Sequence, residues 1–92
     1  MKVMAVWTVK PGALREAVAR FLAGKAEPPA NVSILGRWHS VDLRAGFTLY
    51  ELTDPAVLYE AAAAWADVLD LDNYMVIDDD KAGPALARVF QH

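Results

Sequence analysis

The pattern of hydrophobic and polar positions predicts four strands and three helices. Runs rich in β-branched and aromatic residues predict strands over residues 2–9, 32–41, 47–52 and 71–77. Apolar residues at helical spacing predict helices over residues 12–23 and 55–69, and the acidic run 78–80 opens a C-terminal helix. The order β-α-β-β-α-β plus a C-terminal helix is typical of an α+β, ferredoxin-like fold. At this length we expect a single domain over residues 1–92.

The second predicted strand carries Arg37, Trp38 and His39 side by side, so they must point to alternating faces. Residues 42–46 have the composition of a hairpin loop. With the tip between Leu43 and Arg44, we expect His39 to face Thr48, Trp38 to face Leu49 and Arg37 to face Tyr50, which separates two sets of side chains. We expect the helices to cover the more apolar set: Val3, Ala5, Trp7, Ile34, Trp38, Phe47 and Leu49. We expect the opposite, open face to carry Met4, Val6, Thr8, Arg37, His39, Thr48, Tyr50, Tyr74 and Val76.

This open face mixes apolar and polar groups, and it is too apolar to lie bare in water. A second sheet packed over it, with a small cavity between the two sheets, would satisfy both kinds of side chain. The sequence therefore predicts a homodimer. The tryptophans Trp7, Trp38 and Trp65 are expected in the core, and the second helix is expected to bury Leu58, Ala62, Trp65 and Leu69.

Composition excludes several classes of protein. The chain has no cysteine, so disulfides and thiolate metal sites are excluded. The net charge is −3 and no basic cluster is present, which argues against nucleic-acid binding. No apolar run is long enough to cross a membrane, and the N-terminus lacks the features of a signal peptide, so we expect a cytoplasmic protein. Asp70 and Asp72 lack the pattern of a calcium loop, and we expect neither a metal nor a cofactor.

Four segments, "MKVMAVWTVKPG", "LGRWHS", "GFTLYEL" and "LDLDNYMVIDDDKAG", resemble a family of short bacterial proteins of unknown function. The resemblance covers essentially the whole chain. That family belongs to the dimeric α/β-barrel superfamily, so the resemblance implies a homodimer whose two sheets face each other as a barrel. It implies no activity, because fold alone does not determine chemistry.

The wider superfamily includes cofactor-free monooxygenases, haem-degrading enzymes and isomerase-like proteins. Haem-degrading members use an Asn on the first strand, a Trp on the second helix and a downstream His. Trp65 occupies a comparable position, but the first strand has Val6 and Thr8 in place of Asn, and no His follows before His92. The comparison argues against haem chemistry.

His39 is the main candidate for catalysis, because an imidazole gains and loses a proton near neutral pH. The alternative is a structural histidine. Arg37 could hold a carboxylate or phosphate, or it could form an ion pair with Glu51 or with a second subunit. The candidate ligand-binding residues are Thr8, Arg37, His39, Thr48, Tyr50 and Tyr74.

Three functions are compatible with these residues. The first is a dimer that binds a small apolar or weakly anionic molecule, with Arg37 orienting it. The second is a cofactor-independent isomerase- or monooxygenase-like enzyme, in which His39 moves a proton and Arg37 stabilises developing negative charge. The third is a structural or regulatory dimer that holds no ligand. The sequence favours the first.

Overall fold

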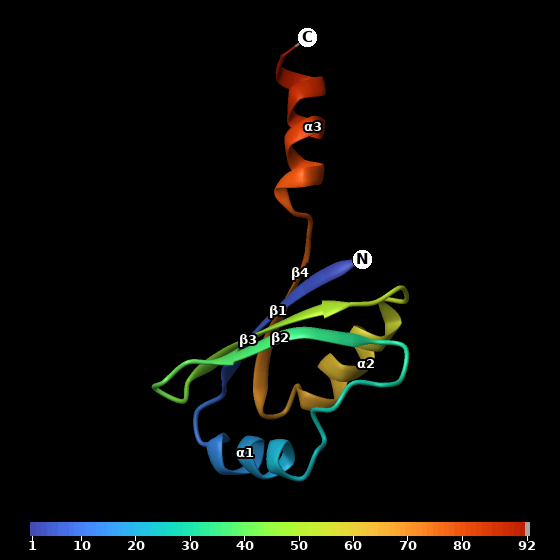
Figure 1. The fold of residues 1–92 in the computed structure, drawn as a ribbon. Coiled ribbons are helices and arrows are strands. Elements are labelled where there is room, and N and C mark those ends of the chain that lie inside the picture. The colour runs from blue at the N-terminus through green and yellow to red at the C-terminus, as the bar shows by residue number, and fades with distance from the viewer. Residues whose placement is uncertain (92) are drawn as a thin grey trace.

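A computed structural model describes residues 1–91. This part of the chain is a mixed α+β fold with three helices and a four-stranded antiparallel sheet (Figure 1). The elements follow in the predicted order: β1 (Lys2–Val9), α1 (Leu14–Leu22), β2 (Ser33–His39), β3 (Ala45–Glu51), α2 (Ala56–Trp65), β4 (Leu69–Val76) and α3 (Asp79–Phe90).

The strands lie in the order β2-β3-β1-β4, and each neighbouring pair is antiparallel. The long connections through α1 and α2 therefore place β1 at the centre of the sheet, between β3 and β4. Figure 1 shows α1 and α2 on one side of the sheet and α3 on the other. The two sides thus have different surroundings, and the side chains on each can be read from the strand register.

The face that α1 and α2 cover carries Val3, Ala5 and Trp7 of β1. These residues pair with Tyr50, Thr48 and Gly46 of β3, and Thr48 and Gly46 pair in turn with Arg37 and His39 of β2. Cross-strand partners share a face. Arg37, His39, Thr48 and Tyr50 therefore lie beneath the helices, and their predicted position on the open face is wrong.

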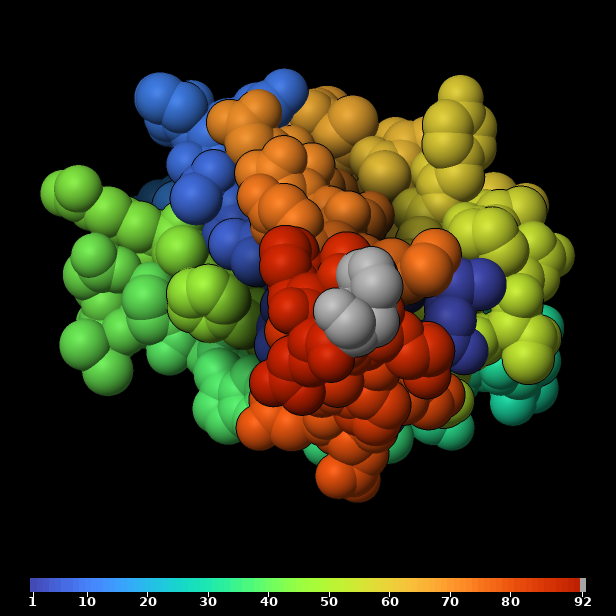
Figure 2. All heavy atoms as spheres, turned by 90° about the horizontal axis from the view of Figure 1, so that it is seen from above, coloured from blue at the N-terminus to red at the C-terminus, as the bar shows by residue number. Residues whose placement is uncertain are grey.

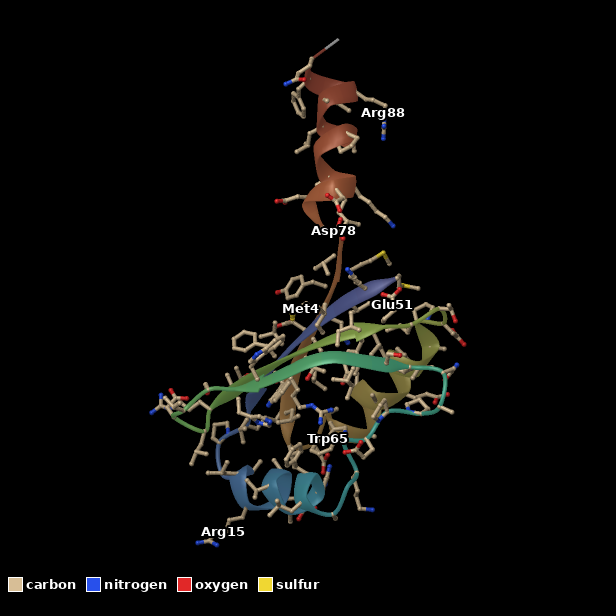
Figure 3. The ribbon with its side chains drawn as sticks, in the orientation of Figure 1. Met4, Arg15, Glu51, Trp65, Asp78 and Arg88 are labelled. Atoms are coloured by element: carbon tan, nitrogen blue, oxygen red, sulfur yellow. The ribbon has the colours of Figure 1, made fainter. Side chains whose placement is uncertain are left out.

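The opposite face, which we call the open face, carries Met4, Val6, Thr8, Trp38, Phe47, Leu49, Tyr74 and Val76, together with the charged residues Lys2, Asp70 and Asp72. Figure 3 shows Met4 on this side of the sheet and Trp65 on the other. The predicted hairpin register is wrong by two residues, because Arg37 pairs with Thr48, Trp38 with Phe47 and His39 with Gly46. A shift of two residues keeps each side chain on its face, so the predicted grouping of Arg37 and His39 with Thr48 is still correct. A register shift between Ile34 and Gly36 reverses the strand before that point, so Ile34 lies opposite Tyr50 on the helix-covered face.

The small core lies at one end of the helix-covered face. Val3, Val32, Leu52 and Leu58 are all more than nine-tenths buried, with Tyr50 and Val57 packed against them. Helix α2 ends at Trp65, earlier than predicted, and Leu69 is the first residue of β4 rather than part of the helix. The expectation that all three tryptophans are core residues fails for Trp38, which is 54% exposed on the open face.

Helix α1 begins and ends beside glycines in the left-handed region: Gly12 and Gly24 both have φ near 79°. Glycine adopts this conformation at little cost, so these two positions let the chain turn sharply on either side of the helix. Arg20 then joins α1 to the segment after α2, because its Nη1 and Nη2 donate to the two carboxylate oxygens of Asp67 at 2.9 and 2.5 Å.

Candidate ligand cavity

A cavity of about 450 Å³ lies between the sheet and helices α1 and α2. Its walls come from all four strands, from both helices and from the loop that holds Lys25 to Pro29. This volume falls in the range of small-molecule sites in proteins. The predicted cavity lay between two sheets, whereas this one forms within a single chain, on the other side of the sheet.

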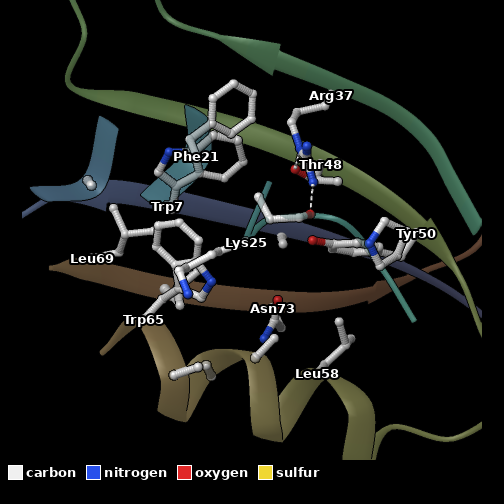
Figure 4. Close-up of a pocket in the computed structure, with 18 of the residues that line it drawn as sticks. Trp7, Phe21, Lys25, Arg37, Thr48, Tyr50, Leu58, Trp65, Leu69 and Asn73 are labelled. Carbon is white, nitrogen blue, oxygen red and sulfur yellow. Dashed lines mark hydrogen bonds between the residues drawn. The ribbon is translucent and has the colours of Figure 1, made fainter. Parts of the chain in front are cut away.

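The two ends of the cavity differ in chemistry (Figure 4). Trp7, Phe21, Trp65 and Leu69 gather at one end and Tyr50 lies at the other, with Arg37 and Thr48 between them, next to Phe21. An apolar pocket with a few convergent polar groups is the usual form of a small-molecule site, because the apolar walls supply contact area and the polar groups fix orientation.

Arg37 is positioned by three neighbours. Its Nη2 donates to the carbonyl oxygen of Ala26 at 2.8 Å, and its Nε lies 3.4 Å from the hydroxyl oxygen of Thr48, a weak donor contact. The guanidinium carbon lies 5.7 Å from the centre of the Phe21 ring, within the range of a cation–π contact. Thr48, the partner of Arg37 on β3, is only 1% exposed, so packing fixes its position.

Arg37 forms no ion pair with a carboxylate within residues 1–91. The predicted alternative partner, Glu51, instead lies 3.8 Å from the N-terminal ammonium group. The other charged residues of the lining, Lys25, Glu27 and Glu60, are exposed, whereas Arg37 is half-buried. Arg37 is therefore the charge that a ligand in the cavity would meet with the least screening by water.

His39 also lines the cavity, at the aromatic end. Its ring packs edge-on against two aromatic rings, with centroid distances of 5.7 Å to Trp7 and 5.2 Å to Phe21. It remains exposed despite these contacts. The imidazole is therefore held in one orientation while keeping access to solvent, an arrangement compatible with either binding or proton transfer.

The indole ring of Trp7 fits into the cavity wall because its cross-strand partner on β3 is a glycine, Gly46. A Cβ atom at Gly46 would overlap the indole ring of Trp7. A related arrangement occurs on the open face, where Gly36 precedes Trp38 by two residues on β2 and a Cβ at Gly36 would overlap the ring of Trp38. Each face of the sheet thus carries one indole lying over a glycine.

Four of the six candidate ligand-binding residues line the cavity: Arg37, His39, Thr48 and Tyr50. Thr8 and Tyr74 do not, because their strand positions place them on the open face, and the prediction that all six share one face is wrong. Met4, Val6 and Val76, expected to give apolar contact to a ligand, also lie on the open face.

Sequence reasoning missed most of the lining, including Phe21 and Asn73. The signal for Phe21 was present, since it belongs to the apolar stripe of the first predicted helix. Asn73 is the one polar residue among the inward positions Leu69, Leu71 and Met75 of β4, and this break in the pattern was the available signal.

Arg20 and Asp67 lie at the surface beside the cavity, close to Trp65. The guanidinium of Arg20 lies 5.8 Å from the centre of the Trp65 ring. Its hydrogen bonds lower the pKa of the Asp67 carboxyl below its usual range, and the same bonds, with a further one to Glu16, raise the pKa of Arg20. This cluster links α1 to the end of α2, and so links the two helices that cover the cavity.

Within residues 1–91, no three His, Asp or Glu side chains lie close enough to hold a metal ion. None of the helices in this part of the chain has the length and apolarity needed to cross a membrane. His92, the first histidine after Trp65 in the sequence, lies outside the described residues.

The fold and the cavity define a small α+β protein with a four-stranded antiparallel sheet and a ligand-sized space beneath its helices. A family model described as "Domain of unknown function (DUF3303)" matches residues 1–90, and the chain belongs to this family. No curated protein and no solved structure matches the chain. The function of the family is unknown, so an activity has to be argued from the cavity itself.

Proposed function

We propose that this protein binds a small molecule with a flat apolar body and an anionic group, such as an aryl carboxylate, in the cavity beneath α1 and α2. The observation that carries the proposal is Arg37, a half-buried guanidinium without a carboxylate partner in residues 1–91. A planar guanidinium binds a carboxylate through paired hydrogen bonds. The aromatic end of the cavity would then pack against the body of the ligand.

Native mass spectrometry of freshly purified protein, followed by denaturation, first asks whether a small molecule co-purifies. Calorimetric titration then compares three aryl carboxylates of increasing size (benzoate, cinnamate and 2-naphthoate) with their neutral amides. We expect at least one acid to bind tenfold or more tightly than its amide, because only the acid can pair with Arg37. A protein that carries no ligand and binds none of these probes below millimolar concentration would contradict the proposal.

Arg37→Met removes the charge and keeps most of the side-chain length. We expect this variant to lose the preference for the acid while binding the amide as before. Arg15→Met is the matched control, because Arg15 is exposed on α1 and does not line the cavity. An equal loss in both variants would indicate a general effect of net charge rather than a site at Arg37.

A second candidate function is a cofactor-independent enzyme, and the placement of His39 between Trp7 and Phe21 favours it. In this case His39 would move a proton on a ligand held by Arg37. His39→Ala separates the two functions. In a binding protein it lowers affinity modestly, whereas in an enzyme it abolishes turnover of the identified ligand and leaves binding largely intact. The third alternative, a structural dimer without a ligand, is favoured if every probe and the co-purification test are negative.

We further propose that the protein is a homodimer in which two ferredoxin-like chains bring their open faces together as an α/β barrel. The support is the exposure of the aromatic residues on this face: Trp38 is 54%, Phe47 42% and Tyr74 56% exposed. Large apolar patches of this kind mark interfaces. The cytoplasmic location expected from the sequence stays a prediction.

Sedimentation equilibrium tests the dimer. We expect a dimer at micromolar concentration, and we expect Trp38→Asp to raise the dimer Kd by at least 100-fold, as loss of a central aromatic contact does. Tyr59→Asp is the control, because Tyr59 is an 81% exposed aromatic residue on α2, away from the open face. A wild-type protein that sediments as a monomer would rule out this assembly without affecting the proposed cavity site.

A further inference from the structure

Helix α3 stands apart from the rest of the described chain. Figure 1 shows it continuing beyond β4 and projecting away from the sheet, on the side opposite α1 and α2. Viewed along this direction, it rises over the middle of the molecule (Figure 2). Only Ile77 and Asp78 separate it from β4, and an ion pair of 3.5 Å between Lys2 and Asp78 holds its first turn beside β1.

One side of α3 is apolar. Ala82, Ala85, Leu86, Val89 and Phe90 recur at the spacing that places side chains on one face of a helix, and we call them the α3 stripe. Its three large members are well exposed: Leu86 57%, Val89 61% and Phe90 77%. Asp80, Lys81 and Arg88 lie on the opposite side by the same spacing. The stripe has the pattern of a helix that packs against another surface, yet it contacts none in the isolated chain.

The sequence of α3 is poorly suited to an unsupported helix. Isolated helices of about 12 residues are marginal in water even when they are rich in alanine. Gly83 and Pro84 lie inside α3, and both residue types disfavour a helix interior, proline because it removes a hydrogen bond and crowds the preceding turn. A helix with this composition needs tertiary packing to be stable, so a surface that covers the α3 stripe is required.

The position of α3 indicates which surface covers it. α3 rises on the same side as the open face, so a second copy packed over that face must lie alongside α3. The usual areas of aromatic side chains give an exposed surface of roughly 500 Å² per chain for four residues: Trp38, Phe47, Tyr74 and Phe90. With Ile77, Leu86 and Val89 the area approaches the ~800 Å² per partner of a stable interface.

We infer that α3 is an exchanged helix: in the homodimer, the α3 stripe of each copy packs against the second copy. The inference rests on the proposed dimer and adds to it a second set of contacts, made by α3 rather than by the sheet. Packing against the second copy also explains why α3 continues in the direction of β4, away from the sheet, instead of folding back over the strands of its own chain.

Hydrogen exchange of the full chain tests whether α3 is covered. At concentrations at which the protein is dimeric, we expect the backbone amides of residues 82–90 to be protected. In the monomeric Trp38→Asp variant we expect them to exchange at nearly the rate of an unfolded peptide. Fast exchange of these amides in the dimer would overturn the inference and leave the dimer standing. Slow exchange in the monomer would show that α3 instead covers its own sheet.

Leu86→Asp and Ala87→Asp provide a matched pair, because the two residues are adjacent and gain the same charge, and only Leu86 belongs to the α3 stripe. We expect Leu86→Asp to weaken the dimer at least tenfold and Ala87→Asp to weaken it less than threefold, by sedimentation equilibrium. Equal effects would contradict a packed stripe.

Exchange between copies can be observed directly. Protein with p-benzoylphenylalanine in place of Phe90 is mixed with ¹⁵N-labelled wild-type protein and irradiated. We expect crosslinks between unlabelled and labelled chains in the mass spectrum. Crosslinks confined to one chain in a dimeric sample would overturn the exchange, whereas the absence of any dimer would remove the proposed assembly together with the inference.

Discussion

The two faces of the sheet are built from the same kinds of residue but differ in what covers them. Each has an aromatic ring lying over a glycine, Trp7 over Gly46 on one side and Trp38 over Gly36 on the other. Under α1 and α2, the sheet carries Arg37, His39, Thr48 and Tyr50 around a cavity. The open face exposes the aromatic residues Trp38, Phe47 and Tyr74, with Asp70 and Asp72 toward its β4 edge.

This difference supports the two proposals, a ligand beneath the helices and a second copy of the chain on the open face. A binding cavity needs polar groups to orient a ligand, so the polar residues lie where the helices enclose a space. An interface gains most from apolar and aromatic contact, so the open face keeps those residues exposed. The covered face is therefore suited to a ligand and the open face to a second copy of the chain.

The paired glycines offer the sharpest way to separate the two faces. Gly46→Ala forces Trp7 out of the cavity wall, and we expect it to destabilise the protein by about 1–3 kcal/mol, as overpacking does, and to abolish ligand binding. Gly36→Ala displaces Trp38 instead, so we expect it to weaken the dimer and to leave the cavity intact. Urea unfolding, calorimetric titration and sedimentation measure the three effects. Loss of binding in both variants alike would show that the faces are not independent.

A smaller effect is expected at Thr48. Thr48→Val keeps the shape of the side chain and removes the hydroxyl near the Nε of Arg37, with a cost of about 1 kcal/mol for the lost polar contact. We expect affinity for the aryl carboxylate to fall several-fold and the dimer Kd to stay unchanged. Thr8→Val, on the open face, is the control, and calorimetric titration should show no change in its affinity for the ligand.

The smallest expected effect is on thermal stability, through the ion pair between Arg20 of α1 and Asp67, which follows α2. Because Arg20 lowers the pKa of Asp67 in the folded protein, this ion pair stabilises the fold above the unfolded-state pKa of Asp, about 4. The stabilisation is lost as the pH falls through the lowered pKa. Asp67 is exposed, so the contribution is small.

Asp67→Asn should therefore lower the Tm slightly at pH 7, and its difference from the wild type should shrink as the pH falls through the lowered pKa of Asp67. Thermal unfolding between pH 2 and pH 7 measures this difference. Glu60→Gln is the control, because Glu60 is exposed on α2 and forms no ion pair within residues 1–91, and it should follow the wild type at every pH. A constant difference between Asp67→Asn and the wild type across this range would contradict a role for the charge of Asp67.

Local patterns in the sequence determined the elements and the sorting of side chains within the hairpin, although not its exact register. The order of strands and helices, the hairpin, and the grouping of Arg37 and His39 with Thr48 and Tyr50 all follow from periodicity and turn residues. Negative charge is favoured at a helix N-terminus, and on this basis the acidic run 78–80 was correctly predicted to begin α3. These features depend on residues close in sequence, and a single chain segment contains the information for them.

Only the tertiary structure decided which face of the hairpin meets the helices. Residues 2–9 are apolar on both sides, so the pattern cannot fix how β1 aligns with β3, and one residue of register exchanges the two faces. The register shift between Ile34 and Gly36 and the early end of α2 at Trp65 are likewise settled by packing across the sheet. The sequence therefore determined which residues act together, and the fold determined that they enclose a cavity within one chain.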